Sequence, residues 1–237
     1  MALDLSKRQI AMLAEMGVRV WDAPKTRMPV VGSDAAAQHE PRVEQIEPGT
    51  WQRLEAAVRS CRACGLCGQR SSAWAPQQAR AASWMVVTDM PAGPGAMHGD
   101  EEMLLDRIFL AVGRRRTGEG EQGVYVTTAV KCRPSGGSAP GEAAIEACRE
   151  HLRREVGLLQ PRMILGMGRF AARALLTSQQ PLGVLRGRGH WFEGVPVVVT
   201  YPVAYLVRHP QEKAKAWADL CLAADIDMKA SKSRGES

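Results

Sequence analysis

The stretch RMILGMGRFAARALL, residues 162–176, decides the fold class of this chain. Its first half, residues 162–168, is a short apolar run that ends in glycine, which is typical of a buried strand followed by a turn. Its second half, residues 169–176, places apolar residues at helical spacing. Gly166 and Gly168 form no dinucleotide-binding fingerprint. The stretch therefore predicts a strand, a tight turn and a helix.

The same alternation of strand and helix continues on both sides of this stretch. Further short apolar runs predict strands at WMVV (84–87), VYVTTAV (124–130) and VPVVVTY (195–201). Helical patterns lie between and around them at residues 50–60, 101–112, 142–159 and 212–226. Short apolar strands that alternate with helices are typical of a parallel sheet covered on both faces. We therefore expect an α/β fold of three layers, α/β/α, around a central, mainly parallel sheet.

Three loops that follow predicted strands carry the candidate active site. They are TDMPAGPG (88–95), TTAVKCRP (127–134) and TYPVAYL (200–206). In open α/β sheets, ligands bind beyond the carboxyl ends of the strands. Any active site is therefore expected to be built from these three loops.

The composition permits a DNA-binding protein without requiring one. Of the 237 residues, 45% are hydrophobic, and the net charge is +6. That charge allows binding to nucleic acid through phosphate neutralisation. No apolar run reaches the roughly 20 residues that a membrane helix needs, and the first residues, MALDLSKRQIAMLAEMG, lack the apolar core of a signal peptide. We expect a cytoplasmic, monomeric protein with no membrane partner.

The composition also divides the chain into four parts. Residues 1–21 predict a helical arm, and residues 22–49, rich in Pro, Ala and polar side chains, predict a flexible linker. Residues 50–226 hold every predicted strand of the main domain, and residues 227–237 form a polar tail. The arm has two interpretations, a packing extension or a segment that binds a protein partner.

Five cysteines suggest a metal site. Cys61, Cys64 and Cys67 stand two residues apart in CRACGLCGQR (61–70), and fifteen residues separate Cys132 from Cys148. Clustered thiols in an intracellular chain favour metal over disulfides. Four thiolates from distant segments can hold zinc or an iron–sulfur cluster, and the spacing leaves both open. The alternative is a set of unrelated buried cysteines, which is how we interpret the sixth, Cys221, on an apolar helix face.

The longer motifs of the chain resemble the family 4 uracil-DNA glycosylases, the iron–sulfur branch of the uracil-DNA glycosylase superfamily. The resemblance covers about residues 51–225 and rests on the Cys132–Cys148 spacing and on VYVTTAVKCRPSGG (124–137), QPRMILGMGRFAARALL (160–176), LRGRGHWFEGVPVVVTYPVAYLVRHP (185–210) and KAKAWADL (213–220). It implies DNA as the partner, and a [4Fe-4S] cluster ligated by Cys61, Cys64, Cys132 and Cys148. Cys67 has no role in the family pattern and could compete as a ligand.

The same resemblance implies which residues would form the uracil pocket. The family flips a uracil out of DNA and hydrolyses its N-glycosidic bond. Asp89 stands at the position of the family's Glu, one methylene shorter. Met97 stands at the position of the stacking Phe, Thr128 at that of the uracil-reading Asn, and Pro202 at that of the His that donates a hydrogen bond. Because proline has neither a side-chain donor nor a backbone N–H, we expect uracil excision to be weak or lost.

Basic and histidine side chains give further candidates. Arg186 and Arg188 in LRGRGH (185–190) match the DNA-facing loop of the family, and arginine suits contact with phosphate. The plainer interpretation of this loop is a solvated basic turn. His190 could offer a substitute donor, and His98 lies in the altered loop, where relocated chemistry could use it.

Three functions remain open at this point. The first is a uracil-DNA glycosylase homologue of base-excision repair, a hydrolase that binds DNA and acts weakly or on another lesion. The second is a non-catalytic iron–sulfur module that binds DNA or a protein partner through the N-terminal arm. The third is a cluster protein for redox sensing or electron transfer, for which any contact with DNA is incidental. A steep dependence of DNA affinity on salt would separate the first two from the third.

Overall fold

The computed structural model describes residues 48–68, 70–73, 81–91, 99–134 and 138–235. The predicted arm, nearly all of the predicted linker, Met97 and His98 lie outside these residues. The strands are β1 (Arg70–Ala73), β2 (Ala82–Thr88), β3 (Gly120–Thr128), β4 (Cys132–Pro134), β5 (Met163–Met167), β6 (Gly189–Phe192) and β7 (Val195–Thr200). The helices are α2 (Pro48–Ser60), η1 (Gly65–Gly68), α3 (Gly99–Ala111), α4 (Glu142–Leu159), α5 (Arg169–Leu176), α6 (Leu182–Leu185), α7 (Val203–Arg208), η3 (Pro210–Glu212) and α8 (Lys213–Gly235).

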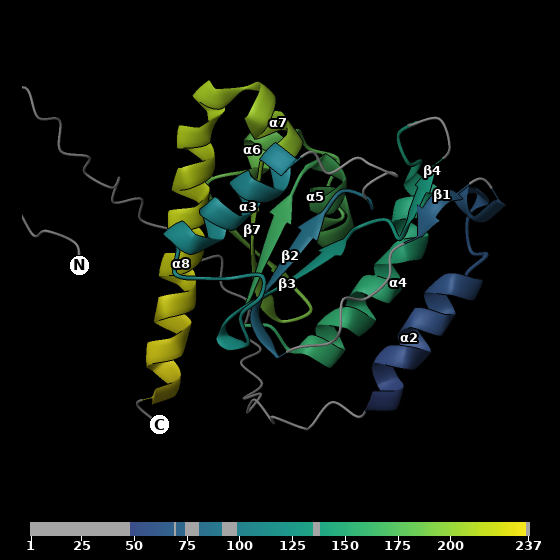
Figure 1. Ribbon diagram of the computed structural model, residues 1–237, viewed down its shortest axis with the longest axis horizontal. Coiled ribbons are helices and arrows are strands. Elements are labelled where there is room, and N and C mark those ends of the chain that lie inside the picture. Colours follow the sequence, from purple (N-terminus) through teal and green to yellow (C-terminus); the bar gives the residue numbers. More distant parts are fainter. Residues whose placement is uncertain (1–47, 69, 74–80, 92–98, 135–137, 236–237) are drawn as a thin grey trace, which may run out of the picture. The chain divides into compact units, whose positions relative to one another are not determined.

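The main sheet has five strands in the order β3-β2-β5-β7-β6 (Figure 1). Strand β2 pairs in parallel with both β3 and β5, and β5 pairs in parallel with β7. Edge strand β6 pairs with β7 in the antiparallel direction. The turn between them, Glu193–Gly194, has φ of 49° and 77°. Two consecutive residues with positive φ are typical of the tight turns that join hairpin strands.

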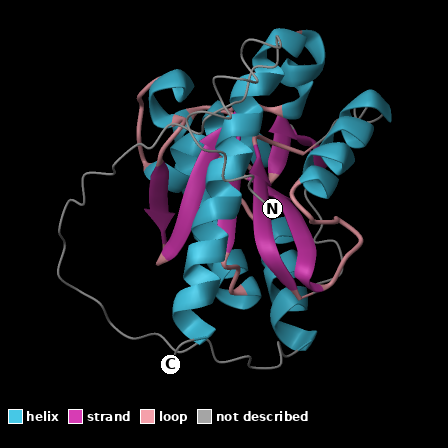
Figure 2. Ribbon diagram, turned by 90° about the vertical axis from the view of Figure 1, so that its left-hand side faces the viewer, coloured by secondary structure: helices cyan, strands magenta, loops and turns pink. Residues whose placement is uncertain are grey.

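Side chains of alternate strand residues form two hydrophobic cores, one on each face of the sheet. In β2, Met85 and Val87 pack with residues of α2, α4 and α5, whereas Trp84 and Val86 pack with residues of α3, α7 and α8. This alternation follows from the two-residue period of a strand. The predicted three-layer α/β/α fold with a mainly parallel sheet is confirmed, and Figure 2 shows the sheet behind the helices of one layer.

A second, two-stranded sheet lies beside the cysteine loop. Strands β1 and β4 pair in the antiparallel direction, with Ala73 opposite Cys132. Figure 1 shows this small sheet beside one end of α4 and of α2. The short helix η1, which includes Cys67, contacts β4. The pairing therefore brings the first cysteine group close to the segment that carries Cys132.

The helix bounds differ from the sequence prediction in one important place. Helices α4 and α5 have the predicted bounds. Helix α8 instead continues past residue 226 to Gly235, where a polar tail was expected. Asp227, the first residue of the expected tail, is buried and forms ion pairs with Arg114 and Arg162, which hold this part of the helix against the core. Of the helices that the structure describes, none combines the length and the apolar character needed to cross a membrane.

Candidate functional site

The last residues of the parallel strands lie side by side, and we call this row the strand-end floor of the candidate site. Thr88 at the end of β2 lies opposite Thr128 of β3 and Met167 of β5, and Met167 lies opposite Thr200 of β7. Asp89 and Pro202 follow β2 and β7 within two residues of these ends. The structure therefore brings Asp89, Thr128 and Pro202 to the same edge of the sheet, as expected for strand ends in an α/β fold.

Asp89 is bound to the start of α5. Its Oδ1 accepts hydrogen bonds from the backbone N–H groups of Phe170 and Ala171, each over 2.9 Å. Helix N-termini leave such groups without partners and favour negative charge. Burial raises the pKa of the Asp89 carboxyl above its ordinary value, while the two amides and the charge of Arg169 act in the opposite direction. One oxygen of the carboxylate is thus used to cap a helix.

Gly168 makes room for this arrangement. Its backbone has φ of 121°, and a Cβ atom added there would collide with the Asp89 carboxylate. The turn glycine that follows β5 therefore allows the close approach of α5 to Asp89.

Thr128 is buried at the end of β3, and its hydroxyl oxygen has no hydrogen-bond partner among the described residues. Its carbonyl oxygen accepts a hydrogen bond of 2.7 Å from the Lys131 Nζ. A buried hydroxyl without a partner costs free energy, and a polar group of a ligand could satisfy it. Thr128 can offer one such contact, whereas an amide side chain at this position could offer a pair.

Pro202 immediately precedes α7. Its carbonyl oxygen accepts hydrogen bonds from the backbone N–H groups of Tyr205 and Leu206, at 3.0 and 3.2 Å. The residue starts the helix but contributes no donor to the strand-end floor. The structure thus gives this position a helix-starting role.

The two arginines of the predicted DNA-facing loop have different surroundings. Arg186 is largely buried, pairs with the buried carboxylate of Asp219 through Nε at 2.7 Å, and stacks on Tyr201 at 4.1 Å. Arg188 is exposed. Because a guanidinium held by a buried carboxylate is poorly placed to meet phosphate, Arg188 is the better candidate for DNA contact.

The partner of Arg186 was not found from the sequence. Asp219 lies on α8, among residues that face the sheet, and burial raises its pKa against the opposing effects of Thr200 and Arg186. The signal was present: a carboxylate on the apolar face of a predicted helix needs a buried partner. Nothing in the sequence identified which of the many arginines would supply it.

A column of rings next to Pro202 was also not predicted. Tyr201 and Tyr205 have ring centroids 5.1 Å apart, and Tyr205 and His209 have centroids 4.3 Å apart. The rings are half-buried, and the column continues from the guanidinium of Arg186. His209 therefore has a packing role beside the candidate site.

The cysteines gather at the small sheet. Cys132 and Cys148 are buried, and Cys61, Cys64 and Cys67 are half-buried. Burial raises the pKa of the Cys148 thiol to about 11; Lys131 opposes this, and the nearby thiols of Cys64 and Cys132 add to it. The structure therefore brings these three thiols within electrostatic reach of one another.

The remaining two cysteines border a cavity of about 280 Å³. It is lined by Arg59, Ser60, Cys61, Arg62, Cys67 and Gly68. Cys61 and Cys67 are thus neighbours of the same space, and the structure does not separate them as candidate ligands.

The donor set consists of thiols. Among the described residues, no three His, Cys, Asp or Glu side chains form a group that could hold a metal ion as they stand. The thiols of Cys64, Cys132 and Cys148 lie within electrostatic reach of one another, and thiolates are the usual ligands of iron–sulfur clusters. The chemistry of these donors is therefore compatible with such a cluster.

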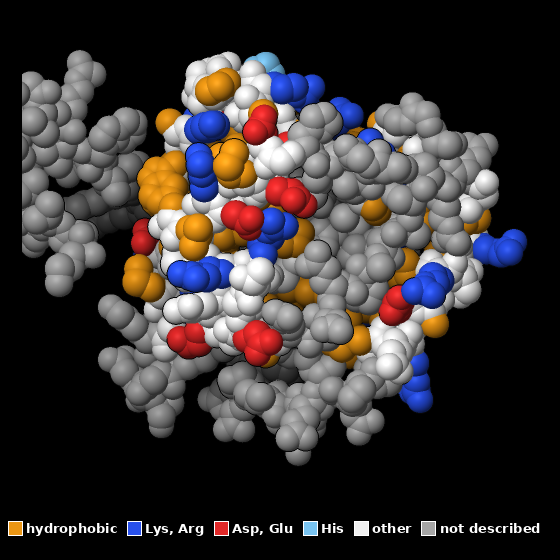
Figure 3. Space-filling model, in the orientation of Figure 1, with side chains coloured by type: hydrophobic (Ala, Val, Ile, Leu, Met, Phe, Trp, Pro, Cys, Tyr) orange, Lys and Arg blue, Asp and Glu red, His pale blue; other side chains and the backbone are white. Residues whose placement is uncertain are grey.

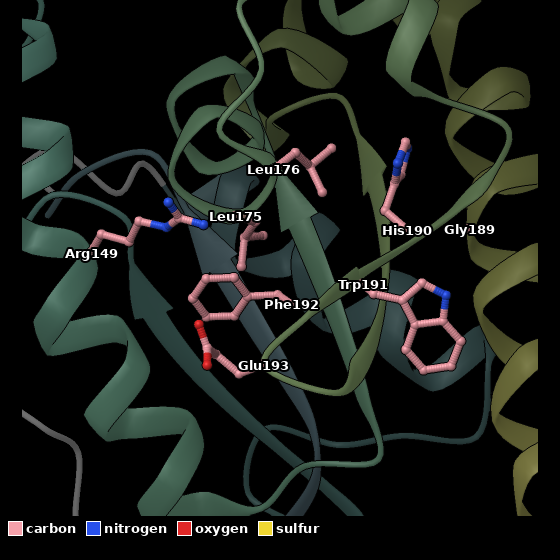
Figure 4. Close-up of a pocket in the computed structure, with 8 residues that line it drawn as sticks. All are labelled: Arg149, Leu175, Leu176, Gly189, His190, Trp191, Phe192 and Glu193. Carbon is pink, nitrogen blue, oxygen red and sulfur yellow. The ribbon is translucent and has the colours of Figure 1, made fainter. Parts of the chain in front are cut away.

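A separate cavity of about 470 Å³ lies on the flank of the sheet (Figure 4). Its lining comes from α4, α5, β6 and the turn after β6: Arg149, Leu175, Leu176, Gly189, His190, Trp191, Phe192 and Glu193. The His190 Nε2 lies 2.8 Å from the Leu185 carbonyl oxygen, so this ring is hydrogen-bonded within its own loop. Because Phe192 pairs with Val195 at the start of β7, the cavity extends towards the strand end opposite the candidate floor.

Charged side chains of both signs share the surface in Figure 3. Over α3 and α8, Lys and Arg side chains alternate with Asp and Glu side chains. Arg116 and Asp106, for example, form an ion pair between α3 and the loop that follows it. This face therefore has no continuous basic surface among its described residues.

Comparisons with known proteins place these features in a family context. The uracil DNA glycosylase superfamily model matches residues 95–221. A type-4 uracil-DNA glycosylase from Pyrobaculum aerophilum is 27% identical over 179 residues, which is 72% of this chain and 91% of that protein. Type-4 uracil-DNA glycosylases from Archaeoglobus fulgidus and Saccharolobus solfataricus are 25% and 28% identical, over 68% and 66% of this chain and 85% and 77% of their own lengths.

Proposed function

This chain belongs to the uracil DNA glycosylase superfamily, and we propose that it is a DNA-repair protein that binds DNA, carries a [4Fe-4S] cluster and excises uracil weakly or not at all. The relatives named above are type-4 uracil-DNA glycosylases. The net charge of +6 favours association with phosphate. The exposed Arg188 is the proposed DNA contact, and Arg186 supports the loop that carries it.

The observation that carries the proposal is the arrangement of Asp89, Thr128 and Pro202 at one sheet edge. An N-glycosidase of this family needs a carboxylate that positions water or supports a cationic sugar. Asp89 retains a carboxylate, but its Oδ1 already accepts two helix amides. These charge-assisted bonds hold the carboxylate in place and oppose the rise in its pKa that burial causes.

The uracil oxygen would lack its usual donor. Charge that develops on a leaving base is stabilised by hydrogen bonds, and loss of one such donor costs on the order of 3–4 kcal/mol in other enzymes. Pro202 has no donor to give, and Thr128 has a single hydroxyl. A pocket with one carboxylate and one hydroxyl supports recognition of a base better than rapid cleavage.

Cys61, Cys64, Cys132 and Cys148 are the proposed cluster ligands. When bound, the cluster would cross-link the loops that carry these cysteines and that are proposed to face DNA. The chain's own residues would do the rest: Asp89 positions the sugar side of the pocket, and Thr128 meets the base. The N-terminal arm, residues 1–21, is proposed to bind a protein partner, with residues 22–49 as linker. The proposed monomeric glycosylase-like domain extends from residue 50 through the end of α8 at Gly235.

The second candidate function is a non-catalytic iron–sulfur module that binds DNA or a partner. It is favoured by the use of Asp89 as a helix cap and of Pro202 as a helix start. In that function the pocket would bind an extruded or unpaired base and leave its glycosidic bond intact.

Single-turnover uracil excision tests the two functions against each other. Enzyme in excess is incubated with single- and double-stranded oligonucleotides that contain uracil, with Asp89→Ala as the control variant. Slow excision that disappears in the variant would support the glycosylase. Binding of DNA without excision by the cluster-loaded protein would support the non-catalytic module, and rapid excision would contradict our account of Pro202 and Thr128.

The cofactor is tested independently of DNA. A protein with broad absorbance near ~400 nm and about four irons per chain would support the cluster, and Cys132→Ala should bleach it. A colourless protein that holds one zinc ion would contradict the assignment.

A further inference from the structure

Lys131 is a buried cation next to the cysteine site. Its side chain is 1% exposed and forms an ion pair with Glu155 of α4, which is fully buried. The Lys131 Nζ also donates to the Thr127 hydroxyl at 2.8 Å and to the Thr128 carbonyl at 2.7 Å. The Tyr125 hydroxyl lies 3.4 Å from the second Glu155 oxygen. Both charges are therefore held by several polar groups in the core.

The backbone of the same lysine contacts a cysteine. The Lys131 N–H donates to the Cys148 Sγ at 3.4 Å, and Cys132 is the next residue. Cys148 and Glu155 are both on α4, seven residues apart, which is nearly two full turns and about 10.5 Å of helix. Segment 131–132 is thus fastened to α4 at two points on one helix face, a thiol and a carboxylate.

The other end of this segment reaches the strand-end floor. Besides the contact between Lys131 and the Thr128 carbonyl, the Val130 N–H donates to the Asp89 carbonyl at 3.2 Å. Arg133 donates to the Pro91 carbonyl at 3.0 Å. Residues 128–133 therefore connect the candidate pocket with Cys132 and Cys148 through contacts at almost every step.

We propose that the Lys131–Glu155 pair is a positioning element that fixes Cys132 and Cys148 relative to each other before any metal binds. As a positioning element, the pair acts through the backbone of residue 131, whose N–H contacts Cys148, and through α4. The inference rests on the proposed function in one respect, the identity of these cysteines as ligands. It adds that half of the ligand set is preorganised by the protein itself.

The energetics favour a positioning role over a simple stabilising one. Desolvation of two buried charges offsets most of their attraction, so a buried pair is often replaceable by apolar side chains without loss of stability. The pair instead fixes the orientation of segment 131–132 relative to α4, because its hydrogen bonds have a defined geometry. Polar groups that orient metal ligands typically change metal affinity by about 10- to 100-fold when they are removed.

The first experiment uses the metal-free full-length protein and needs no cluster. Alkylation rates of individual thiols are measured by mass spectrometry in wild type and in the double variant K131M/E155M. We expect Cys132 and Cys148 to react about tenfold faster in the variant, because the segment opens locally. Cys221, on α8, is the internal reference and should react at the same rate in both proteins.

The matched control is R186M/D219M, which replaces another buried ion pair that lies on α8 and the loop before β6. It should leave the rates of Cys132 and Cys148 unchanged. Equal protection of these two thiols in wild type and K131M/E155M would overturn the proposal. Should K131M/E155M fail to fold, K131Q/E155Q removes both charges while it keeps polar side chains at both positions. Faster alkylation of Cys132 and Cys148 in that variant would support the proposal, and unchanged protection would overturn it.

The second experiment measures cluster loss. Wild type and K131M/E155M, both reconstituted, are exposed to an iron chelator, and the absorbance near ~400 nm is followed. We expect about 10- to 100-fold faster loss in the variant. A wild type that never takes up iron would contradict the proposed cofactor, and the alkylation result would still decide the positioning role.

Discussion

At the scale of single residues, Asp89 and Gly168 depend on each other. The carboxylate can reach the amides of α5 because the residue before the helix has no Cβ. The same carboxylate is the only candidate for a catalytic acid or base among Asp89, Thr128 and Pro202. Structural and chemical roles therefore compete for one functional group, and substitutions can separate them.

Asp89→Asn and Asp89→Ala test this separation. Asparagine keeps the acceptor for the two amides, whereas alanine removes it, so we expect alanine to lower the free energy of unfolding by about 1 kcal/mol more. Because burial raises the pKa of Asp89, the folded state retains its proton more readily than the unfolded state. This contribution to stability is present below the ordinary pKa and is lost as pH rises through the raised pKa.

Urea unfolding of wild type and Asp89→Asn at about pH 4.5 and about pH 7.5 checks the sign. The free energy of unfolding of the variant, relative to that of the wild type, should be higher at the higher pH, because the variant has no carboxylate to ionise. If the wild type instead became more stable relative to the variant at the higher pH, the cause that we assign to the raised pKa would be contradicted.

Pro202→His is the matching test of the missing donor. The position starts α7 through its carbonyl group, which histidine also has, so we expect the helix to remain. A restored donor should increase single-turnover uracil excision by about 10²-fold. Pro202→Ala removes the ring without adding a donor and should leave excision unchanged. An equal increase in both variants would show that the proline ring, and not the missing donor, limits the reaction.

At the scale of elements, the sequence identified the core strands and most helices, because their apolar patterns are set by burial within the element. Helices α4 and α5 begin and end where predicted. The strand β6 was not predicted, since its four residues include an exposed tryptophan and two that are half-buried. The strands β1 and β4 also escaped prediction, because they depend on pairing between segments about 60 residues apart.

The candidate site was predictable in location and less so in detail. The positions of Asp89, Thr128 and Pro202 follow from their place after strands. The capping of α5 by Asp89 and the pairing of Arg186 with Asp219 depend on contacts 81 and 33 residues apart, which no local pattern encodes.

Helix α8 offers a test of how one residue fixes an element. Asp227 pairs with Arg114 and Arg162, and one of its oxygens accepts the Trp84 Nε1–H at 2.9 Å. Asp227→Ala would leave buried donors without their acceptor, so we expect a loss of about 3–5 kcal/mol in the free energy of unfolding. Asp225→Ala, two residues earlier and exposed, should change it by less than about 0.5 kcal/mol. Similar effects of the two substitutions in chemical denaturation would contradict this account.

At the scale of the whole molecule, the chain has a net charge of +6, and the face in Figure 3 carries acidic as well as basic side chains. The proposed binding of DNA would then depend, on this face, on individual cations more than on a continuous basic surface. Arg188 is exposed, whereas Arg186 is bound to Asp219. The two arginines, neighbours in one motif, should therefore respond differently to substitution.

Arg188→Ala should weaken DNA binding and reduce the slope of log affinity against log salt by about 1, as expected for one lost phosphate contact. Its thermal stability should match that of the wild type. Arg186→Ala should instead lower stability by about 3–5 kcal/mol, because Asp219 would be left buried without its cation. Affinity measured over a salt series, together with thermal unfolding, checks both. An unchanged salt slope in Arg188→Ala would remove this residue from the DNA-binding surface.

The register of the strand ends has a consequence for how such a protein diversifies. The side chains that build the core lie within the strands, while those proposed to contact the nucleotide lie at the strand ends, in the last residue of β3 (Thr128) or one or two positions after β2 and β7 (Asp89 and Pro202). Substitutions at these positions leave the strand pairing and both hydrophobic cores in place, and their cost is limited to local contacts such as the cap that Asp89 gives α5. The reaction can therefore change or be lost in such proteins while the residues of the core stay similar. Membership of the family consequently predicts the fold more firmly than it predicts the reaction.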